Sequence, residues 1–193
     1  MRFWTLDNKI REKKMEREFL PVSIALLTVS DTRVIENDKS GNLLANKIKQ
    51  SGHILFDRKI VKDEILDIQK ASKKWIKQPN VEVIISTGGT GLTGRDVSPE
   101  AFREIFDKEI EGFGELFRFL SFKKIGTSTI QSRTLAGVSN GTYIFILPGS
   151  PSACKDAWDE ILVHQLDYRH KPCNFVEIIP RLLEKGIGRT GKS

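Results

Sequence analysis

The sequence predicts an α/β domain of three layers, in which a mainly parallel sheet lies between two layers of helices and a single hairpin interrupts the parallel order. Three observations support this. Residues 22–30 (VSIALLTVS) and 81–86 (VEVIIS) are apolar and β-branched, as strands buried on both faces are. Amphipathic segments with helical spacing alternate with such runs. Asn140-Gly141, a dipeptide typical of tight hairpins, divides residues 134–149.

The first half of the chain alternates between the residue patterns of strands and of amphipathic helices. After the strand at 22–30, residues 40–52 place Leu43, Leu44 and Ile48 on one helical face and end at a glycine. Residues 54–61 (ILFDRKIV) suit a second strand. A second helix follows over 63–76, and we expect Asp63 to be its N-cap.

The second half begins with the buried strand at 81–86. Ser98 followed by Pro99 predicts the start of the next helix, with serine as the cap and proline in the first helical position. This helix, or a pair of helices, extends to about residue 122. The hairpin follows, and a second Ser-Pro pair at Ser150 starts the last helix.

Length and charge indicate one domain with charged ends. A chain of 193 residues suits a single core, which we place at 21–179, with a charged extension at 1–20 and a basic tail at 180–193. Of the net charge of +6, the extension carries +2 and the tail +3. The nearly neutral body argues against a nucleic-acid surface. Without an apolar run of membrane length or a secretory signal, we expect no membrane contact and a cytoplasmic location.

The metal-ligating residue types are scattered. Cys154 and Cys173 form no C-x-x-C pair, and we expect both to be reduced and structural. The histidines are not at the spacing of a zinc site. The sequence therefore gives little support to a preformed transition-metal centre.

A loop rich in glycine and threonine follows the strand at 81–86. Gly89, Gly91 and Gly94 satisfy G-x-G-x-x-G, but the helix starts only after Gly94, which argues against a dinucleotide fingerprint. Arg95 and Asp96 stand where a P-loop has lysine and serine or threonine. Free backbone amides ahead of a helix still favour phosphate binding, although a bare strand-to-helix connection is the alternative.

Asp96 beside this loop is the informative residue. A carboxylate repels phosphate unless a cation intervenes, and Mg²⁺ is commonly held by one or two carboxylates together with substrate phosphates. Asp96 therefore indicates a magnesium nucleotide. Charge alone gives equal support to a second role, in which Asp96 stabilises the positive end of the following helix.

Several separated motifs resemble the MoaB/MogA family of molybdopterin-binding proteins, which acts in molybdenum cofactor biosynthesis. The likeness covers roughly residues 21–176, and its motifs are TVSDTR, DKSG, STGGTGLTGRDVSPEA, EGFGELFRFLSFKKIGTSTIQSR, FILPGSPSACKDAW and KPCNF. IGTSTIQSR and KPCNF are similar to the B branch of that family. The resemblance implies an α/β/α fold that binds molybdopterin and adenylylates its terminal phosphate with Mg-ATP, releasing pyrophosphate.

The resemblance also assigns residues. Asp63 and Asp96 would be catalytic and would hold magnesium with ATP, and Glu100 would support them. The phosphate loop would be Thr87, Gly88, Gly89, Thr90 and Gly91. The cleft for pterin and nucleotide would be lined by Ser30, Asp31, Asp38, Ser132, Pro148, Gly149 and Ser150. Lys62-Asp63-Glu64 departs from the Pro-Asp-Glu of adenylylating relatives, so the acids are kept in a different loop sequence.

Two alternatives to this enzyme remain open. Some members of the B branch lack one or more of the acids, which leaves a non-catalytic pterin-binding or accessory role in the same pathway. A dehydrogenase has only the failed glycine motif in its favour. A phosphate monoester is already an anionic nucleophile near neutral pH, so the absence of a catalytic histidine does not count against adenylylation.

The same resemblance implies a homo-oligomer, a trimer or a hexamer, with the hexamer favoured, and other proteins of the pathway as possible partners. The segment EGFGELFRFLSF carries more apolar residues than one helical face holds, namely Phe113, Leu116, Phe117, Phe119, Leu120 and Phe122. We therefore expect this segment to lie near a subunit boundary.

Overall fold

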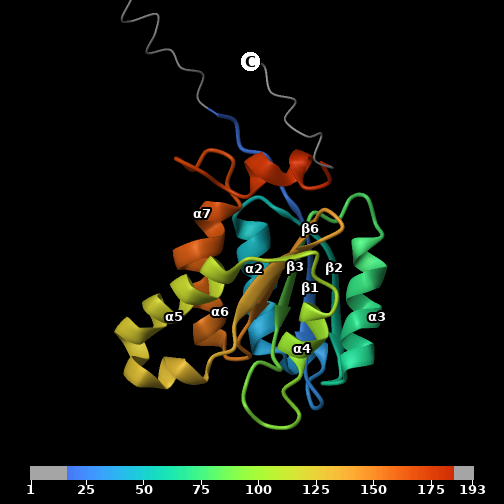
Figure 1. The fold of residues 1–193 in the computed structure, drawn as a ribbon, viewed down its shortest axis with the longest axis vertical. Coiled ribbons are helices and arrows are strands. Elements are labelled where there is room, and N and C mark those ends of the chain that lie inside the picture. Colours follow the sequence, from blue (N-terminus) through green and yellow to red (C-terminus); the bar gives the residue numbers. More distant parts are fainter. Residues whose placement is uncertain (1–16, 185–193) are drawn as a thin grey trace, which may run out of the picture.

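The computed structural model describes residues 17–184 (Figure 1). Residues 1–16 of the predicted extension and 185–193 of the predicted tail lie outside the described part. Arg17, the first described residue, forms an ion pair with Glu177 at 3.0 Å, and its guanidinium lies over the ring of Tyr168. Residues 17–20 therefore contact the domain body. Within the described range, the helices are all too short or too polar to cross a membrane.

A six-stranded mixed sheet forms the middle layer, in the order β2-β1-β3-β6-β5-β4. The strands are β1 (Ser23–Val29), β2 (Ile54–Val61), β3 (Val83–Thr87), β4 (Lys108–Glu109), β5 (Leu135–Ser139) and β6 (Thr142–Leu147). The first three and β6 run parallel, whereas β5 is antiparallel to both β6 and β4. The predicted parallel sheet with one hairpin is confirmed.

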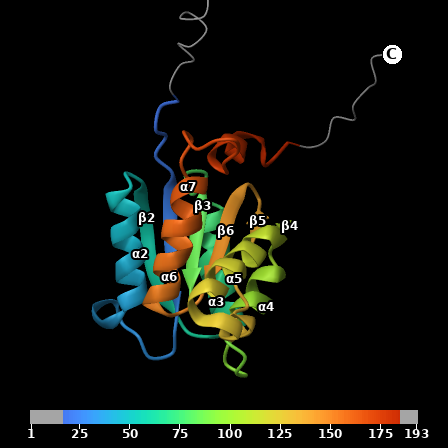
Figure 2. The ribbon, with the colours of Figure 1, turned by 90° about the vertical axis from the view of Figure 1, so that its left-hand side faces the viewer.

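Helices cover both faces of the sheet (Figures 1 and 2). The larger core packs one face against α2 (Lys39–Gln50), α5 (Glu111–Ile125), α6 (Pro151–Ala157) and the π-helical turn η3 (Trp158–Leu162). The second core packs the other face against α3 (Ile65–Ile76) and α4 (Ser98–Arg103). Val83 and Ile85 of β3 face the first core and Ile84 the second, as alternation along a strand requires. The three predicted layers are confirmed.

The remaining elements are short. They are η1 (Ile35–Asn37), η2 (Gly126–Gln131), α7 (Val163–Gln165) and η4 (Val176–Arg181). η2 continues directly from the end of α5, and η4 lies at the end of the sheet remote from the loop that follows β3 (Figure 1). η4 thus lies towards the amino ends of the parallel strands, and the loop after β3 lies at their carboxyl ends.

Two predicted N-caps were wrong, although the predicted helix start at Ser98 and Pro99 is confirmed. α3 begins at Ile65 after Glu64, and Asp63 does not cap it. Ser98 is the first residue of α4 rather than its cap, and its hydroxyl donates to the carbonyl of Gly88 at 2.8 Å. The hydroxyl of Ser98 thus has a tertiary partner instead of a helix amide. The predicted helix from 98 to about 122 is a pair, α4 and α5, separated by β4.

The predicted hairpin turn is confirmed in detail. Asn140 has a φ of 44° and Gly141 a φ of 81°, the left-handed conformation that this dipeptide tolerates. The hairpin places β5 beside β6, and β4 pairs with the outer side of β5. Because β5 starts beside the end of β6, the residues just before β5 lie at the carboxyl ends of the parallel strands.

Candidate functional site

Four loops gather at the carboxyl ends of the parallel strands. The register aligns Thr28 of β1, Thr87 of β3 and Leu147 of β6 across the sheet, so the chain leaves these strands at one level. The loops are residues 30–38, 62–64, 88–97 and 148–150. The loop at 88–97 extends beyond the sheet below α4 in Figure 1. This is where parallel α/β folds bind ligands.

The glycine loop depends on glycine for its shape. Gly88 and Gly89 have φ values of 103° and 64°. A Cβ on Gly88 would lie 2.2 Å from the carbonyl oxygen of Val29. The amide of Gly88 donates to Leu147 at 3.1 Å, and the amide of Ser98 donates to Gly89 at 3.0 Å. The loop is therefore fixed to β6 and to α4.

The threonines of this loop face inward. Thr87 is buried, and its hydroxyl lies 2.8 Å from the carbonyl of Pro148, to which it donates. The hydroxyl also lies 3.1 Å from the sulfur of Cys154. Thr90 is buried as well. Among the expected phosphate-loop residues, Thr87 thus fixes the loop to the turn after β6 through its hydroxyl.

Asp63 and Asp96 both pack against loop glycines, although they come from different loops. A Cβ on Gly89 would lie 2.4 Å from Asp63 Oδ1, and a Cβ on Gly91 would lie 2.7 Å from Asp96 Oδ2. The two glycines thus make room for two carboxylates. The structure brings together the acids that the sequence analysis paired.

The two carboxylates differ in their hydrogen bonds. Asp63 Oδ1 is buried without a hydrogen-bond partner, and burial together with the negative charges of Asp31 and Asp96 raises the pKa of Asp63 to about 6. Burial also raises the pKa of Asp96, but donation from the Thr93 hydroxyl at 2.6 Å and the Thr93 amide at 2.9 Å outweighs it. The pKa of Asp96 therefore lies below its ordinary value.

Arg95 bridges two further acids above this pair. Its guanidinium donates to both oxygens of Asp31, at 2.9 to 3.1 Å, and to Glu64 at 2.8 Å. The hydrogen bonds from Arg95 lower the pKa of Asp31. Asp31 and Glu64 thus share one cation. Glu64 directly follows Asp63 in the chain, but its residue type and position alone did not predict this ion pair.

Arg133 is a second residue that the sequence analysis missed. It donates to the carbonyl of Gly91 at 2.7 Å and to that of Asp96 at 2.6 Å. It also forms an ion pair with Glu100. Glu100 thus supports the acids indirectly, by holding an arginine that braces the glycine loop. The sequence feature that could have pointed to Arg133 is its place as the last residue of the motif IGTSTIQSR.

Asp38 is the expected cleft residue whose carboxylate lies beneath the surface. It is fully buried and caps α2 by accepting from the amide of Gly41 at 2.9 Å. The hydroxyl of Thr28 donates at 2.6 Å and Arg58 at 2.8 Å. These donors outweigh burial and hold the pKa of Asp38 below its ordinary value. Its side chain fixes the loop after β1 and has no open face for a ligand.

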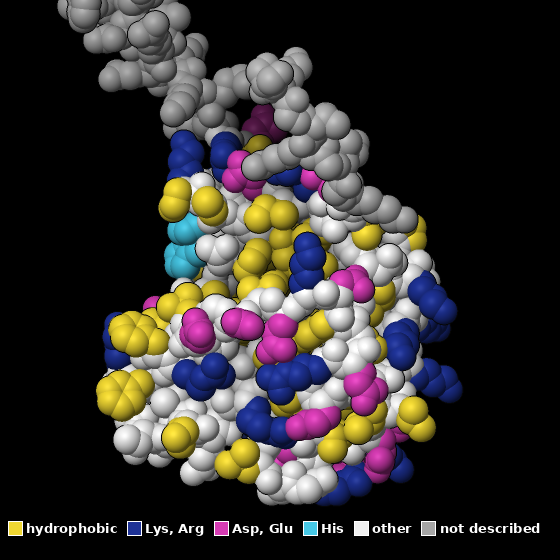
Figure 3. Space-filling model, in the orientation of Figure 1, with side chains coloured by type: hydrophobic (Ala, Val, Ile, Leu, Met, Phe, Trp, Pro, Cys, Tyr) yellow, Lys and Arg dark blue, Asp and Glu magenta, His cyan; other side chains and the backbone are white. Residues whose placement is uncertain are grey.

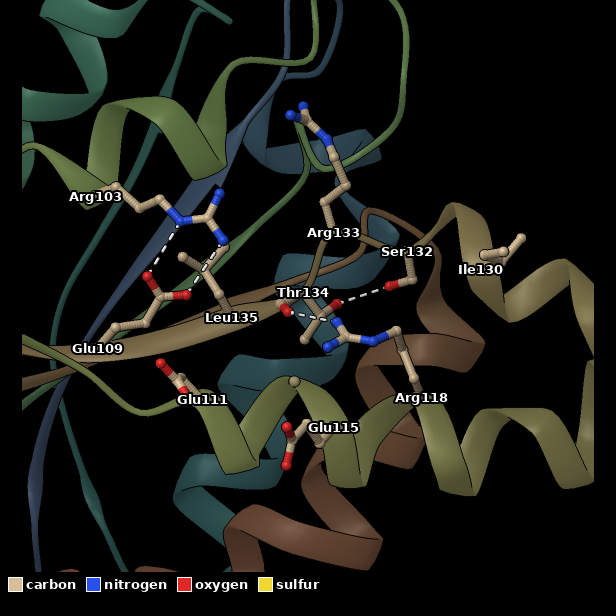
Figure 4. Close-up of a pocket in the computed structure, with 11 residues that line it drawn as sticks. Arg103, Glu109, Glu111, Glu115, Arg118, Ile130, Ser132, Arg133, Thr134 and Leu135 are labelled. Carbon is tan, nitrogen blue, oxygen red and sulfur yellow. Dashed lines mark hydrogen bonds and ion pairs between the residues drawn. The ribbon is translucent and has the colours of Figure 1, made fainter.

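The other expected cleft residues shape neighbouring loops. Ser30 Oγ accepts from the amides of Thr32 and Arg33, both at 3.3 Å. Ser150 caps α6. The carbonyl of Gly149 accepts from Ser40 at 2.7 Å, and Pro148 accepts from Thr87 as described above. Ser132 lies apart from these, on the lining of a cavity of about 500 Å³ beside α5 (Figure 4).

The donor set can be tested against magnesium. Across residues 17–184, no three His, Cys, Asp or Glu side chains form a preformed metal cluster. Mg²⁺ does not require one, since it is commonly bound by one or two carboxylates with substrate phosphates. A buried carboxylate oxygen without a partner, on Asp63, beside Asp96 and a glycine loop, matches that pattern. These residues fit magnesium bound together with a nucleotide.

Comparison with known proteins identifies the family. The family model described as "Probable molybdopterin binding domain" matches residues 25–168. The chain belongs to this family. It is 50% identical over 162 residues to molybdenum cofactor biosynthesis protein B of Escherichia coli (strain K12), which covers 84% of this chain and 95% of that protein. The B protein of Staphylococcus epidermidis is 44% identical over 152 residues, covering 77% and 86% respectively.

Solved structures of the same family share the fold. A crystal structure of molybdenum cofactor biosynthesis protein B has a TM-score of 0.76 at 40% identity, covering 78% of this chain and 94% of that one. The tungsten cofactor synthesizing protein MoaB from Pyrococcus furiosus has a TM-score of 0.67 at 34% identity, with 74% and 91% covered. The expected resemblance to the MoaB/MogA family is therefore confirmed, including its B branch.

Proposed function

We propose that this chain binds molybdopterin and transfers AMP from Mg-ATP to the terminal phosphate of the pterin, releasing pyrophosphate. The observation that carries this proposal is the packing of Asp63 and Asp96 against Gly89 and Gly91 of the glycine loop. Two carboxylates beside an anion-binding backbone favour a nucleotide that arrives with a divalent cation. Membership of a molybdopterin-binding family supports the pterin as the second substrate.

The transfer needs no general base. The phosphate monoester of molybdopterin is anionic near neutral pH, so one of its oxygens attacks the α-phosphorus of ATP directly. The new P–O bond forms as the bond from that phosphorus to the bridging oxygen breaks, and pyrophosphate leaves with the electron pair. Magnesium, when bound, neutralises the charge on the nucleotide phosphates.

The chain's own residues have three tasks in this scheme. Asp63 and Asp96 would hold magnesium, and backbone amides of the glycine loop other than that of Gly88, which donates to Leu147, would hold phosphate oxygens. Arg133 keeps the carbonyls of Gly91 and Asp96 in place and so positions the loop. Fixed positioning and charge neutralisation are the main demands of phosphoryl-group chemistry.

Asp96→Asn tests the proposal. The variant keeps the size of the side chain but removes the charge, so we expect adenylylation to fall by about a hundredfold or more, as loss of charge stabilisation in a transition state does. The assay is incubation of purified protein with molybdopterin, ATP and Mg²⁺, followed by detection of the adenylylated product. Asp67→Asn, an exposed aspartate of α3, is the matched control. Transfer at the wild-type rate in folded Asp96→Asn would contradict the magnesium assignment.

A binding role without transfer is the second candidate. Arg95 already neutralises Asp31 and Glu64, so part of the acidic charge available to a metal is engaged within the chain. In this case the protein would hold molybdopterin for another protein of the pathway. Wild-type protein that binds molybdopterin but forms no adenylylated product with ATP and Mg²⁺ would favour this role.

We further propose that the chain forms a closed homo-oligomer, a hexamer in preference to a trimer, through α5. Phe119, Phe122 and Ile125 are 60%, 55% and 56% exposed, and Leu116 is 43% exposed on the same helix. Hydrophobic side chains gather over α5 at the left edge of Figure 3. Such a face favours a partner, and closed symmetric assemblies are the usual arrangement.

Phe119→Glu tests the interface. We expect a lower mass by light scattering at micromolar concentration, because a charge at the centre of an apolar contact is left unpaired. Leu66→Glu, on an exposed position of α3, should leave the mass unchanged. A wild-type monomer would contradict assembly, whereas a wild-type trimer would contradict only the hexamer.

A further inference from the structure

The strand β2 forms one edge of the sheet, and within residues 17–184 it pairs only with β1. The amide of Ser30 donates to the carbonyl of Val61 at 2.9 Å, so the backbone of Val61 faces β1. Successive residues of a strand turn their N–H and C=O groups to opposite sides. Ile60 therefore presents its amide and its carbonyl outward, as a donor and an acceptor that an added strand could use.

Only the second half of this edge is open to pairing. Proteins close exposed edges with bulges, proline or local hydrogen bonds. The bulge of β2 lies opposite Ile24 and Ala25, in the first half of the strand. The amide of Arg58 already donates to Oδ1 of Asp57 at 2.8 Å. Residues 59–62 contain no proline and are the part that remains available.

Two hollows lie on opposite faces of this part of the edge. Residues 59–62 line both of them. The first hollow, of about 530 Å³, is completed by α3, and the second, of about 550 Å³, by the loop after β1. The faces differ because Val61 packs against the core below α3, whereas Arg58 turns to Asp38 at the start of α2. A strand added here would point its side chains into the two hollows alternately.

The hollow beside α3 is strongly basic. Its lining includes Lys59, Lys62, Lys70 and Lys74, with Asp67 as the acid among them. Lys59 has a salt bridge to a neighbour on β2, but the other three lysines have none to any side chain of the described chain. Lys70 and Lys74 lie one turn apart on α3, where like charges repel. Figure 3 shows Lys and Arg side chains gathered over α3 at the right-hand edge. An acidic ligand would relieve this repulsion.

The hollow on the other face has an apolar part. Val34 and Ile35 belong to its lining and are 55% and 46% exposed. Both are β-branched, and such side chains pack well against the side chains of a neighbouring strand. The two faces of the edge thus favour different residues in an added strand, acidic ones beside α3 and apolar ones beside the loop after β1.

Charge argues against the ends of the chain itself as the added strand. Residues 1–16 hold five basic and three acidic side chains, and residues 185–193 hold three basic and no acidic ones. The lysines beside α3 would repel both. Lysines also protect sheet edges from unwanted pairing, but Lys70 and Lys74 belong to α3 and not to the edge strand. These observations favour a negatively charged segment of another protein.

We propose that the second half of β2 accepts an extended segment of a partner protein as an added strand, in which acidic and apolar residues alternate. The backbone of the segment would pair with Ile60, as peptides that extend a sheet do. Its acidic side chains would point to the lysines beside α3, and its apolar side chains to Val34 and Ile35. The inference goes beyond the proposed function, because neither pterin nor nucleotide takes part.

Fluorescence anisotropy with the full chain tests the proposal. The probe is a labelled peptide of about eight residues in which valine and glutamate alternate. A second peptide of the same composition, with its valines and glutamates in separate blocks, is the control. We expect saturable binding of the alternating peptide, weakened by added salt, and binding of the block peptide that is weaker by about tenfold, since only alternation serves both hollows.

Two variants separate the charge from the strand pairing. Lys70→Glu/Lys74→Glu should weaken binding by about tenfold or more, because like charges then meet. Lys49→Glu/Lys108→Glu, which changes two exposed lysines elsewhere by the same charge, should have no effect. Ile60→Pro removes the outward amide, and we expect a loss of about fivefold, whereas Ile60→Val keeps the amide and the affinity. Circular dichroism checks that each variant is folded.

Four outcomes would overturn the proposal. The first is no binding of the alternating peptide to the wild type up to about millimolar concentration. The second is equal binding of the two peptides, which would show attraction of charge without an added strand. The third is unchanged binding in folded Lys70→Glu/Lys74→Glu. The fourth is a lower mass of folded Ile60→Pro by light scattering, which would assign this edge to a second copy of the chain.

Discussion

Asp38 and Asp63 follow two neighbouring parallel strands, and only one of them has its hydrogen bonds satisfied. Asp38 is fully buried, yet donors from Thr28, Gly41 and Arg58 keep its pKa low. Asp63 is less deeply buried, yet one of its oxygens has no partner and its pKa is raised to about 6. The supply of donors, more than the depth of burial, separates these two acids.

This difference indicates what each region is for. A carboxylate with three donors is a structural part, because its removal leaves those donors unpaired. A carboxylate kept beside other acids without a partner lowers stability, and such groups are concentrated at functional sites. The loop after β1 therefore holds the fold, whereas the loop after β2 keeps a carboxylate oxygen without a hydrogen-bond partner.

The largest expected effect comes from Asp38→Asn. The change leaves the guanidinium of Arg58 inside the protein without a counterion and removes one acceptor, so we expect the free energy of unfolding to fall by about 3–5 kcal/mol. Urea unfolding followed by circular dichroism measures it. Asp67→Asn, an exposed aspartate, should change stability by less than about 0.5 kcal/mol. A similar small loss for Asp38→Asn would contradict its structural role.

A smaller effect of opposite sign is expected from Asp63→Asn. The folded protein binds the Asp63 proton more tightly than the unfolded chain does, so this group lowers stability as the pH rises from about 4 to about 6. Asparagine has no charge to bury, and we expect a gain of about 1–2 kcal/mol near pH 7.5 that disappears near pH 4. Urea unfolding at both pH values measures the gain. Destabilisation near pH 7.5 would mean that the ionised carboxylate has a partner.

The smallest expected effect sharpens the comparison at Asp96. Thr93→Val removes the hydroxyl that donates to Asp96 but keeps the backbone amide, so we expect a loss of about 0.5–1 kcal/mol in unfolding free energy. The pKa of Asp96 should move upward, because a donor to the charged form is lost. Titration of the Asp96 carboxyl carbon by NMR detects the shift. An unchanged pKa would show that the amide alone stabilises the charge.

The sequence by itself determined the layers and the position of the candidate site in the chain. Strand and helix periods are local properties of the chain, so β1, β3, α2 and the hairpin at Asn140-Gly141 could be predicted from the pattern of residues. The glycine loop and Asp96 are adjacent in sequence, so the proposal that they bind phosphate and a cation could be made from the sequence. The motifs shared with the family added Asp63.

Only the tertiary structure decided which polar groups are satisfied. Asp38 and Asp63 are the same type of residue. The donors to Asp38, however, come from β1, α2 and β2, which meet only in the folded protein. The pairing of Arg95 with Asp31 and Glu64, and the place of Arg118 beside Gly114, likewise depend on how loops and helices pack. Hydrogen-bond satisfaction is a property of three-dimensional neighbours, and sequence separation does not specify them.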